Sequence, residues 1–180
     1  MDNKTKGMVM TAMVVLSLVL GLLAVLGSSW ITAEDEGMEA NYSLSEAEVD
    51  TGIFGTMVID YGDSCDESDD DNDEICDLAL AGTIGTVGLW LGIVMAVVFA
   101  AMLVLPMAGV DAMDGMPGAA KQIISWGTGL MMLLGTIGWL ILKPELEDGM
   151  ELGMSFIMAI IAGVLGLAAS AMGMLVKADE

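Results

Sequence analysis

The chain has 180 residues, of which 56% are hydrophobic, and its mean hydropathy is +0.74. It carries 26 acidic residues against five lysines, with no arginine or histidine, so its net charge is -21. This charge argues against nucleic acid and anionic lipid surfaces as partners, because both need basic patches on the protein. Apolar residues and charges fall into separate blocks, which is typical of a multi-pass membrane protein.

Four apolar blocks without a charged residue follow one another along the chain. Each is long enough for the roughly 20 residues that a helix needs to cross a membrane. The first block exceeds the apolar core of a signal peptide, about 7–15 residues, so we interpret it as a span. We therefore predict one domain, residues 1–180, built as an all-α transmembrane four-helix bundle. The predicted spans are residues 7–30, 79–105, 123–142 and 152–176.

The lysines predict the orientation of these spans, because cytoplasmic loops carry an excess of positive charge. With a cytoplasmic N-terminus, Lys4, Lys6, Lys121 and Lys177 lie inside and only Lys143 lies outside. We therefore expect a plasma-membrane protein with both termini in the cytoplasm. The predicted loops are extracellular at 31–78, cytoplasmic at 106–122 and extracellular at 143–151. About seventeen of the acidic residues fall in the first extracellular loop.

Within that first loop, the acidic stretch 34–39 is predicted to be irregular. Residues 51–61 are rich in β-branched and aromatic side chains, which favour a strand. Tyr42 and Leu44 are assigned to a preceding strand, so we expect a small antiparallel sheet. At the span ends we expect Trp30, Trp126 and Trp139 to anchor the membrane interface, and we expect Trp90 to pack inside the second span.

Cys65 and Cys76 are the only cysteines, and both fall in the first extracellular loop. An oxidising compartment favours a structural disulfide between them. In the chain-entropy account, closing a ring of this size stabilises the fold by roughly 2.5–3 kcal/mol. The complete prediction is therefore a transmembrane bundle with a small β-rich, disulfide-closed extracellular cap.

Seven acids lie between the two cysteines, and some have the spacing of a calcium loop. Asp69, Asp71 and Asp73 match D-x-D-x-D, but the sixth position is Glu74 rather than glycine, and the twelfth is Leu80. A solvated run of charge is the simpler interpretation. Two alternatives stay open: a weak divalent-cation site at Asp69, Asp71, Asp73 and Glu74, with Ca²⁺ as the candidate ion, and docking of a basic partner.

Small residues recur inside the spans at helix-packing intervals, where they let helix backbones approach closely. They are Gly85, Gly88, Gly92, Gly135, Gly138, Ala162, Gly166 and Ser170. Packing within one bundle is the simpler interpretation, and packing between subunits of a homo-oligomer is the alternative. The spans carry no ionisable residue, and the chain contains no histidine and no G-x-S-x-G motif. We therefore predict that the protein is not an enzyme and uses no cofactor.

The layout resembles the claudin and peripheral-myelin-protein superfamily. In that family a Trp opens the first loop, followed by Gly-Leu-Trp and then by two cysteines that join neighbouring strands through a disulfide. Trp30 matches the first Trp, Gly52-Ile53-Phe54 resembles Gly-Leu-Trp, and Cys65 and Cys76 match the cysteine pair. Phe54 stands where the family has the Trp of Gly-Leu-Trp, and the gap between Phe54 and Cys65 is longer than the corresponding gap in the family.

The resemblance implies a non-enzymatic cell-surface protein that acts in lateral or cell-cell assembly through its acidic first extracellular loop. Its expected partners are the lipid bilayer and either other membrane proteins or further copies of the chain. The alternative is an accessory or pore-forming subunit of a cation channel or transporter, in which the acidic loop forms an outer vestibule.

Overall fold

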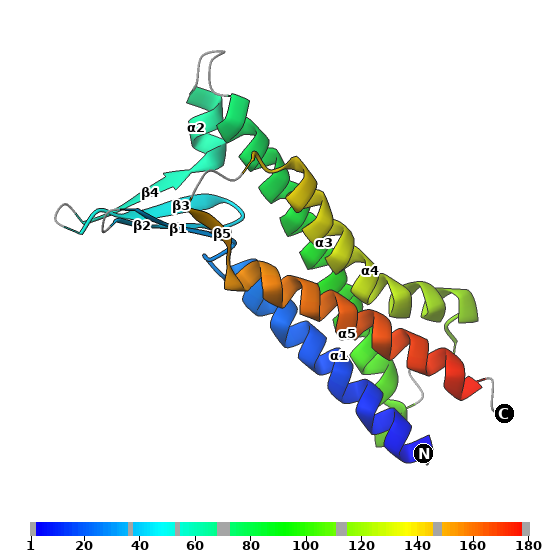
Figure 1. The fold of residues 1–180 in the computed structure, drawn as a ribbon. Coiled ribbons are helices and arrows are strands. Elements are labelled where there is room, and N and C mark those ends of the chain that lie inside the picture. Colours follow the sequence, from blue (N-terminus) through cyan, green and yellow to red (C-terminus); the bar gives the residue numbers. More distant parts are fainter. Residues whose placement is uncertain are drawn as a thin grey trace.

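A computed structural model describes residues 3–35, 38–52, 55–67, 73–110, 115–145 and 149–177. Most of this part of the chain is helical, and four of its helices are long and apolar enough to cross a membrane, as a multi-pass membrane protein requires. These helices are α1 (Asn3–Leu26), α3 (Asp73–Val104), α4 (Gly118–Leu142) and α5 (Met154–Lys177). The start of α1 and the end of α5 lie at the same end of the molecule, opposite the sheet (Figure 1).

The long helices contact one another in pairs. α3 packs along α4, α1 packs along α5, and further contacts join α4 to α5 and α1 to α3. A short helix, α2 (Tyr61–Glu67), precedes α3, and a 3₁₀ turn, η1 (Pro106–Ala108), follows it. The main cluster of buried side chains extends from the junction with the sheet, at Trp30 and Trp139, to the middle of the long helices, at Leu89 and Met132. A second cluster, around Val14 and Phe99, lies nearer the start of α1.

One five-stranded antiparallel sheet projects from the helices (Figure 1). Its strands are β1 (Ile31–Asp35), β2 (Met38–Tyr42), β3 (Glu46–Asp50), β4 (Thr56–Asp60) and β5 (Met150–Leu152). Their order across the sheet is β4-β3-β2-β1-β5, so a segment that precedes α5 pairs with the segment that follows α1. The prediction of a small antiparallel sheet is therefore confirmed, and β5 is an addition that the sequence did not predict.

Two local predictions in the first loop are wrong. The stretch 34–39 is not irregular, because it contains the end of β1 and the start of β2, which pair through Glu34 and Glu39. The strand predicted over 51–61 forms only as β4, and before it Thr51, Gly52 and Gly55 belong to a turn in which the N–H of Thr51 donates to the carbonyl oxygen of Gly55. Gly52 and Gly55 have φ values of 65° and 86° in that turn, a region that glycine enters at low cost and β-branched residues avoid.

The helix ends differ from the predicted span ends at α1 and at α3. α1 stops at Leu26, and the next residue, Gly27, has no room for a side chain because a Cβ there would collide with Ser155. α3 begins at Asp73, ahead of its apolar block, and carries Glu74 in its first turn, where a helix favours acids. Its 32 residues exceed what a membrane requires, so its first turns extend the helix beyond the apolar block.

Candidate assembly surface

Trp30 joins the sheet to the helices. Its ring is completely buried and meets the ring of Trp139 edge to face, with centroids 4.8 Å apart, and Phe156 packs beside both. The indole N–H of Trp30 donates to the carbonyl oxygen of Ala24 at 2.9 Å. Its backbone N–H donates to Tyr42, and its carbonyl oxygen accepts from the N–H of Gly153. All these polar groups are satisfied, so the loop after α1 is fixed against both β2 and the start of α5.

The tryptophan predictions must be corrected accordingly. Trp30 and Trp139 are core residues, 0% and 1% exposed, and do not anchor the membrane interface. Trp90, predicted to pack inside its span, is 45% exposed on α3. Aromatic content near a span end was the only signal in the sequence, and it cannot show which side of the helix faces the core.

The sheet is amphipathic across all five strands, because directly paired residues in an antiparallel ladder share a face. One face, here called the apolar face, contains Ile31, Ala33, Ala40, Tyr42, Ala47, Val49, Met57, Ile59, Met150 and Leu152. The other, here called the acidic face, contains Glu34, Glu39, Glu46, Glu48, Asp50, Asp60 and Glu151. The registers thus separate residues that alternate along each strand into two chemically distinct surfaces.

The apolar face is only partly covered. Ile31 and Ala47 are buried, and Tyr42 and Met150 pack against the main core. Toward β4 the cover ends: Met57 is 60% exposed and Ile59 is 37% exposed. Exposed apolar side chains that adjoin one another on a surface outside the helices are typical of a protein interaction site.

β4 also forms one edge of the sheet, and all five of its residues are exposed. The N–H of Tyr61 donates to the carbonyl oxygen of Ser45 at 3.0 Å, on the side of β3. Since backbone groups alternate in direction along a strand, the N–H and carbonyl of Val58 point away from β3. Such an edge is a template for pairing with another chain.

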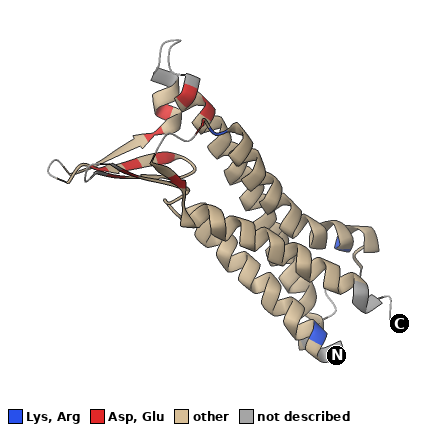
Figure 2. Ribbon diagram, viewed as in Figure 1, with Lys and Arg blue, Asp and Glu red and all other residues tan. Residues whose placement is uncertain are grey.

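The acids concentrate at the sheet end. In Figure 2 the red segments lie on the sheet, on α2 and on the first turns of α3, whereas the long helices are almost entirely tan. On the acidic face, Glu34, Glu46 and Glu48 are all exposed, so their charges are hydrated. Hydration and salt screening weaken repulsion between such charges.

The predicted disulfide is present between Cys65 and Cys76, with Cα atoms 5.0 Å apart. It connects α2 to the first turns of α3. The resemblance implied that the two cysteines would lie on neighbouring strands, and this expectation is wrong. The disulfide instead closes the short connection between two helices, so it fixes α2 at the end of α3.

The other residues of the family motif and of the candidate metal site are placed only in part. Gly52 lies in the turn before β4, whereas Phe54, Asp69 and Asp71 lie outside the described residues. Asp73 begins α3, and Glu74 is exposed in its first turn. Among the residues that the structure describes, no three acidic or cysteine side chains group closely enough to hold a metal ion.

The predicted packing residues face other parts of the same chain. A Cβ on Gly85 would lie 3.3 Å from the Cβ of Trp139, and one on Gly138 would lie 2.9 Å from Ile84. Gly88 meets the backbone of Gly135, Gly92 meets Met132, and Gly166 meets Gly129. The hydroxyl of Ser17 donates to the carbonyl oxygen of Ala162, and that of Ser170 donates to the carbonyl oxygens of Ser125 and Gly166.

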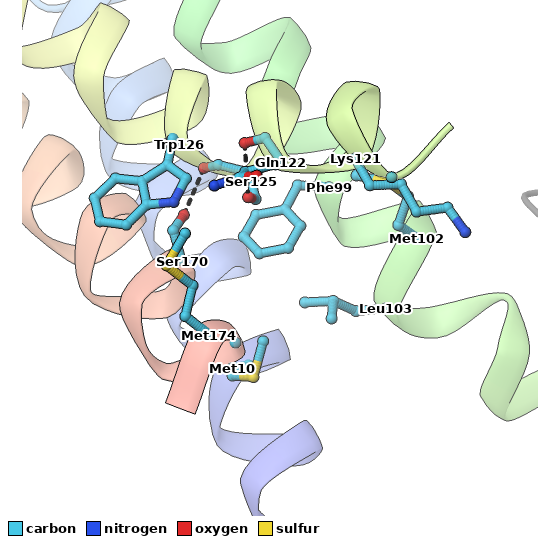
Figure 3. Close-up of a pocket in the computed structure, with 12 residues that line it drawn as sticks. Met10, Phe99, Met102, Leu103, Lys121, Gln122, Ser125, Trp126, Ser170 and Met174 are labelled. Carbon is cyan, nitrogen blue, oxygen red and sulfur yellow. Dashed lines mark hydrogen bonds between the residues drawn. The ribbon is translucent and has the colours of Figure 1, made fainter. Parts of the chain in front are cut away.

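A cavity of about 350 Å³ lies at the opposite end of the molecule, between the four long helices (Figure 3). Met10, Phe99, Met102, Leu103 and Met174 give it mainly apolar walls. Two serines that line it already have partners: Ser170 donates to the carbonyl oxygen of Ser125, and the hydroxyl of Ser125 donates to that of Gln122. The cavity is therefore lined mainly by apolar side chains, and the hydroxyl groups of its two serines already donate hydrogen bonds within the chain.

No protein-family model matches this chain, and no curated protein matches it either.

Proposed function

We propose that the chain is a non-enzymatic, multi-pass protein of the cell surface that assembles laterally or between cells, with further copies of itself or with other membrane proteins. In this proposal the helices span the plasma membrane and both termini lie in the cytoplasm, as the lysine distribution favours. The four helices form a bundle, and the sheet with α2 forms an extracellular cap. The resemblance of its layout to the claudin and peripheral-myelin-protein superfamily supports the same class of function.

The uncovered side of β4 carries the proposal. Met57 and Ile59 expose apolar surface on the sheet, outside the four long helices, and removing that surface from water is favourable. Beside them, the outward backbone groups of Val58 have no partner strand on that edge. A partner that adds a strand to β4 would cover the exposed apolar side chains and would form hydrogen bonds with the outward backbone groups of Val58.

The acidic face has a complementary role in this arrangement. Its charges keep one surface of the sheet hydrated and oppose face-to-face stacking of two such surfaces. Acids on one face and apolar residues on the other therefore favour assembly along the edge and the apolar face. A basic partner protein would be recognised on the acidic face instead.

Single-cysteine cross-linking tests the proposal in native membranes. Cys65 and Cys76 are joined in a disulfide, so a Val58→Cys variant has one free thiol. We expect mild oxidation to give a covalent dimer, or an adduct with a neighbouring membrane protein. The matched control is Val97→Cys, because Val97 is similarly exposed, 52% against 58%, but lies on α3 within the apolar block.

A second variant, Val58→Pro, removes the outward N–H that a partner strand would use. Cross-linking with a bifunctional reagent that joins carboxylates should then give fewer oligomers from Val58→Pro than from the unmodified chain. If Val58→Cys cross-links no more than Val97→Cys, and the unmodified chain is monomeric without partners, the assembly proposal is wrong.

A subunit of a cation channel or transporter is the second candidate, favoured by the concentration of acids at the sheet end. An acidic vestibule raises the local concentration of cations at a pore entrance. Conductance of the purified chain in reconstituted bilayers, reduced when Asp69, Asp71 and Asp73 are neutralised, would favour this function over assembly.

A further inference from the structure

Tyr61 carries a buried hydroxyl group for which the described part of the chain supplies no partner. The residue is 3% exposed, and its oxygen is enclosed without a hydrogen bond. Burial raises the pKa of this hydroxyl well above its ordinary value, and Tyr42 and Glu46 add to the effect. The group is therefore protonated at neutral pH and remains a hydrogen-bond donor. A buried donor without an acceptor is costly, which points to a partner supplied from outside the chain.

Tyr61 lines a groove of about 310 Å³ where the sheet meets α3. Leu44 and Asp60 form its sheet side, and Gly82, Thr83 and Thr86 form its helix side. Gly82 makes the junction possible, because a Cβ at this position would overlap the backbone of Leu44. The groove lies at the start of the apolar block of α3, which is the level of the lipid head groups if the helices span a membrane.

A second groove, of about 300 Å³, continues from the first between α3 and α4. The two share Thr83 and Val87 as common lining residues. Beyond them the second groove is lined by Ile84, Leu91, Met131 and Leu134, all apolar, with Gly88 and Gly135 at its base. Both grooves have mainly apolar walls, but Asp60, Tyr61 and Thr86 line only the first one, so the polar groups gather at its sheet end and become fewer along α3 toward the middle of the helices.

We propose that these two grooves bind one bilayer lipid, with its polar end at Tyr61 and its acyl chain along Val87 and Leu91. When the lipid binds, the wall of the groove opens enough for the enclosed hydroxyl of Tyr61 to donate to an oxygen of the lipid's polar end. Asp60 stands at the same groove as a carboxylate, so an anionic head group is repelled and an uncharged or zwitterionic one is accepted. The site extends beyond the assembly surface: it uses no residue of the apolar face, and it shares only Asp60, the last residue of β4, with the edge of the sheet.

Native mass spectrometry of the purified full chain tests this site. The protein is exchanged into mixed micelles with either phosphatidylcholine or phosphatidylglycerol, and the lipid retained per chain is counted. We expect one phosphatidylcholine to be retained, and phosphatidylglycerol to be retained much less. Tyr61→Phe keeps the ring and removes only the donor, so it should weaken retention about fivefold, which corresponds to one ordinary hydrogen bond.

Matched controls separate lipid binding from general packing. Tyr42→Phe removes a hydroxyl from a half-buried tyrosine outside both grooves, and it should leave lipid retention unchanged. Val87→Trp fills the shared wall and should abolish retention, whereas Val97→Trp, at an equally exposed position outside both grooves, should not. Equal retention by Tyr61→Phe and the unmodified chain, or equal retention of the two lipids, would overturn the proposal. Because cross-linking through Val58 does not involve these grooves, either proposal can fail alone.

Discussion

Gly88 of α3 and Gly135 of α4 touch backbone to backbone: a Cβ built on Gly135 would lie 2.8 Å from the Cα of Gly88. No side chain fits between the two helices at this level. We therefore expect Gly88→Ala to destabilise the fold by about 1–3 kcal/mol, because the added methyl group forces α3 and α4 apart. Gly115→Ala is the control, since a Cβ there meets nothing within 4 Å. Thermal unfolding in mild detergent measures both, and equal melting temperatures would contradict the contact.

Trp139 is the second test of the core, because it packs on Trp30 where the sheet joins the helices. Trp139→Ala should lower the free energy of unfolding by about 3–5 kcal/mol, the usual effect of removing a large buried aromatic side chain. Trp90→Ala removes the same atoms from a half-exposed site and should have a much smaller effect. Chemical unfolding followed by circular dichroism compares them. Similar losses in both variants would show that the burial assigned to Trp139 is wrong.

The disulfide between Cys65 and Cys76 should stabilise the junction of α2 and α3. Reduction is expected to lower the free energy of unfolding by about 3 kcal/mol, mainly by releasing the unfolded chain from a closed ring. Melting curves with and without a phosphine reductant measure the difference. A Cys65→Ser, Cys76→Ser double variant should melt like the reduced protein and should not respond to the reductant.

Tyr61→Phe should stabilise the protein in detergent without added lipid, by about 1 kcal/mol, because it removes a buried hydroxyl that has no partner in the described chain. The pH dependence has a definite sign. Since the pKa of Tyr61 is raised in the folded state, the stability does not depend on its titration below the unfolded-state pKa of about 10, and the stability falls as the pH rises above that value. The advantage of Tyr61→Phe should therefore grow between pH 8 and pH 11. A difference in stability between Tyr61→Phe and the unmodified chain that stays constant across that range would exclude the burial effect.

The membrane helices and the disulfide were predictable because they depend on local composition. An apolar block such as 123–142 identifies a helix by its length alone, and two cysteines allow only one pairing. Element ends were less predictable, since they depend on contacts with distant segments. Gly27 ends α1 next to Ser155, which no local pattern indicates.

The candidate site was predicted even less completely, for the same physical reason. In β1 and β3, acids such as Glu34 and Glu48 alternate with residues that include small alanines on the opposite face of the sheet. The alternation of polar and apolar residues is therefore weak in the sequence. β5 has only three residues, and its pairing with β1 spans most of the chain. Tyr61 carried no signal of its own in the sequence, because its burial is created by Gly82 and the loop between β2 and β3.

Because β5 pairs with β1, the sheet can be completed only late in the synthesis of the protein. β1 leaves the ribosome early, but the segment that completes the sheet beside it follows α4 and directly precedes α5. Until then, the side of β1 that receives β5 is an open edge, and the carbonyl oxygen of Trp30 still lacks the N–H of Gly153. The sheet is therefore finished only after three of the four long helices have been made. A chain truncated after α4 would present the five-residue edge of β1 in place of the three-residue edge of β5, and it would be a target for quality control in the membrane where it is made.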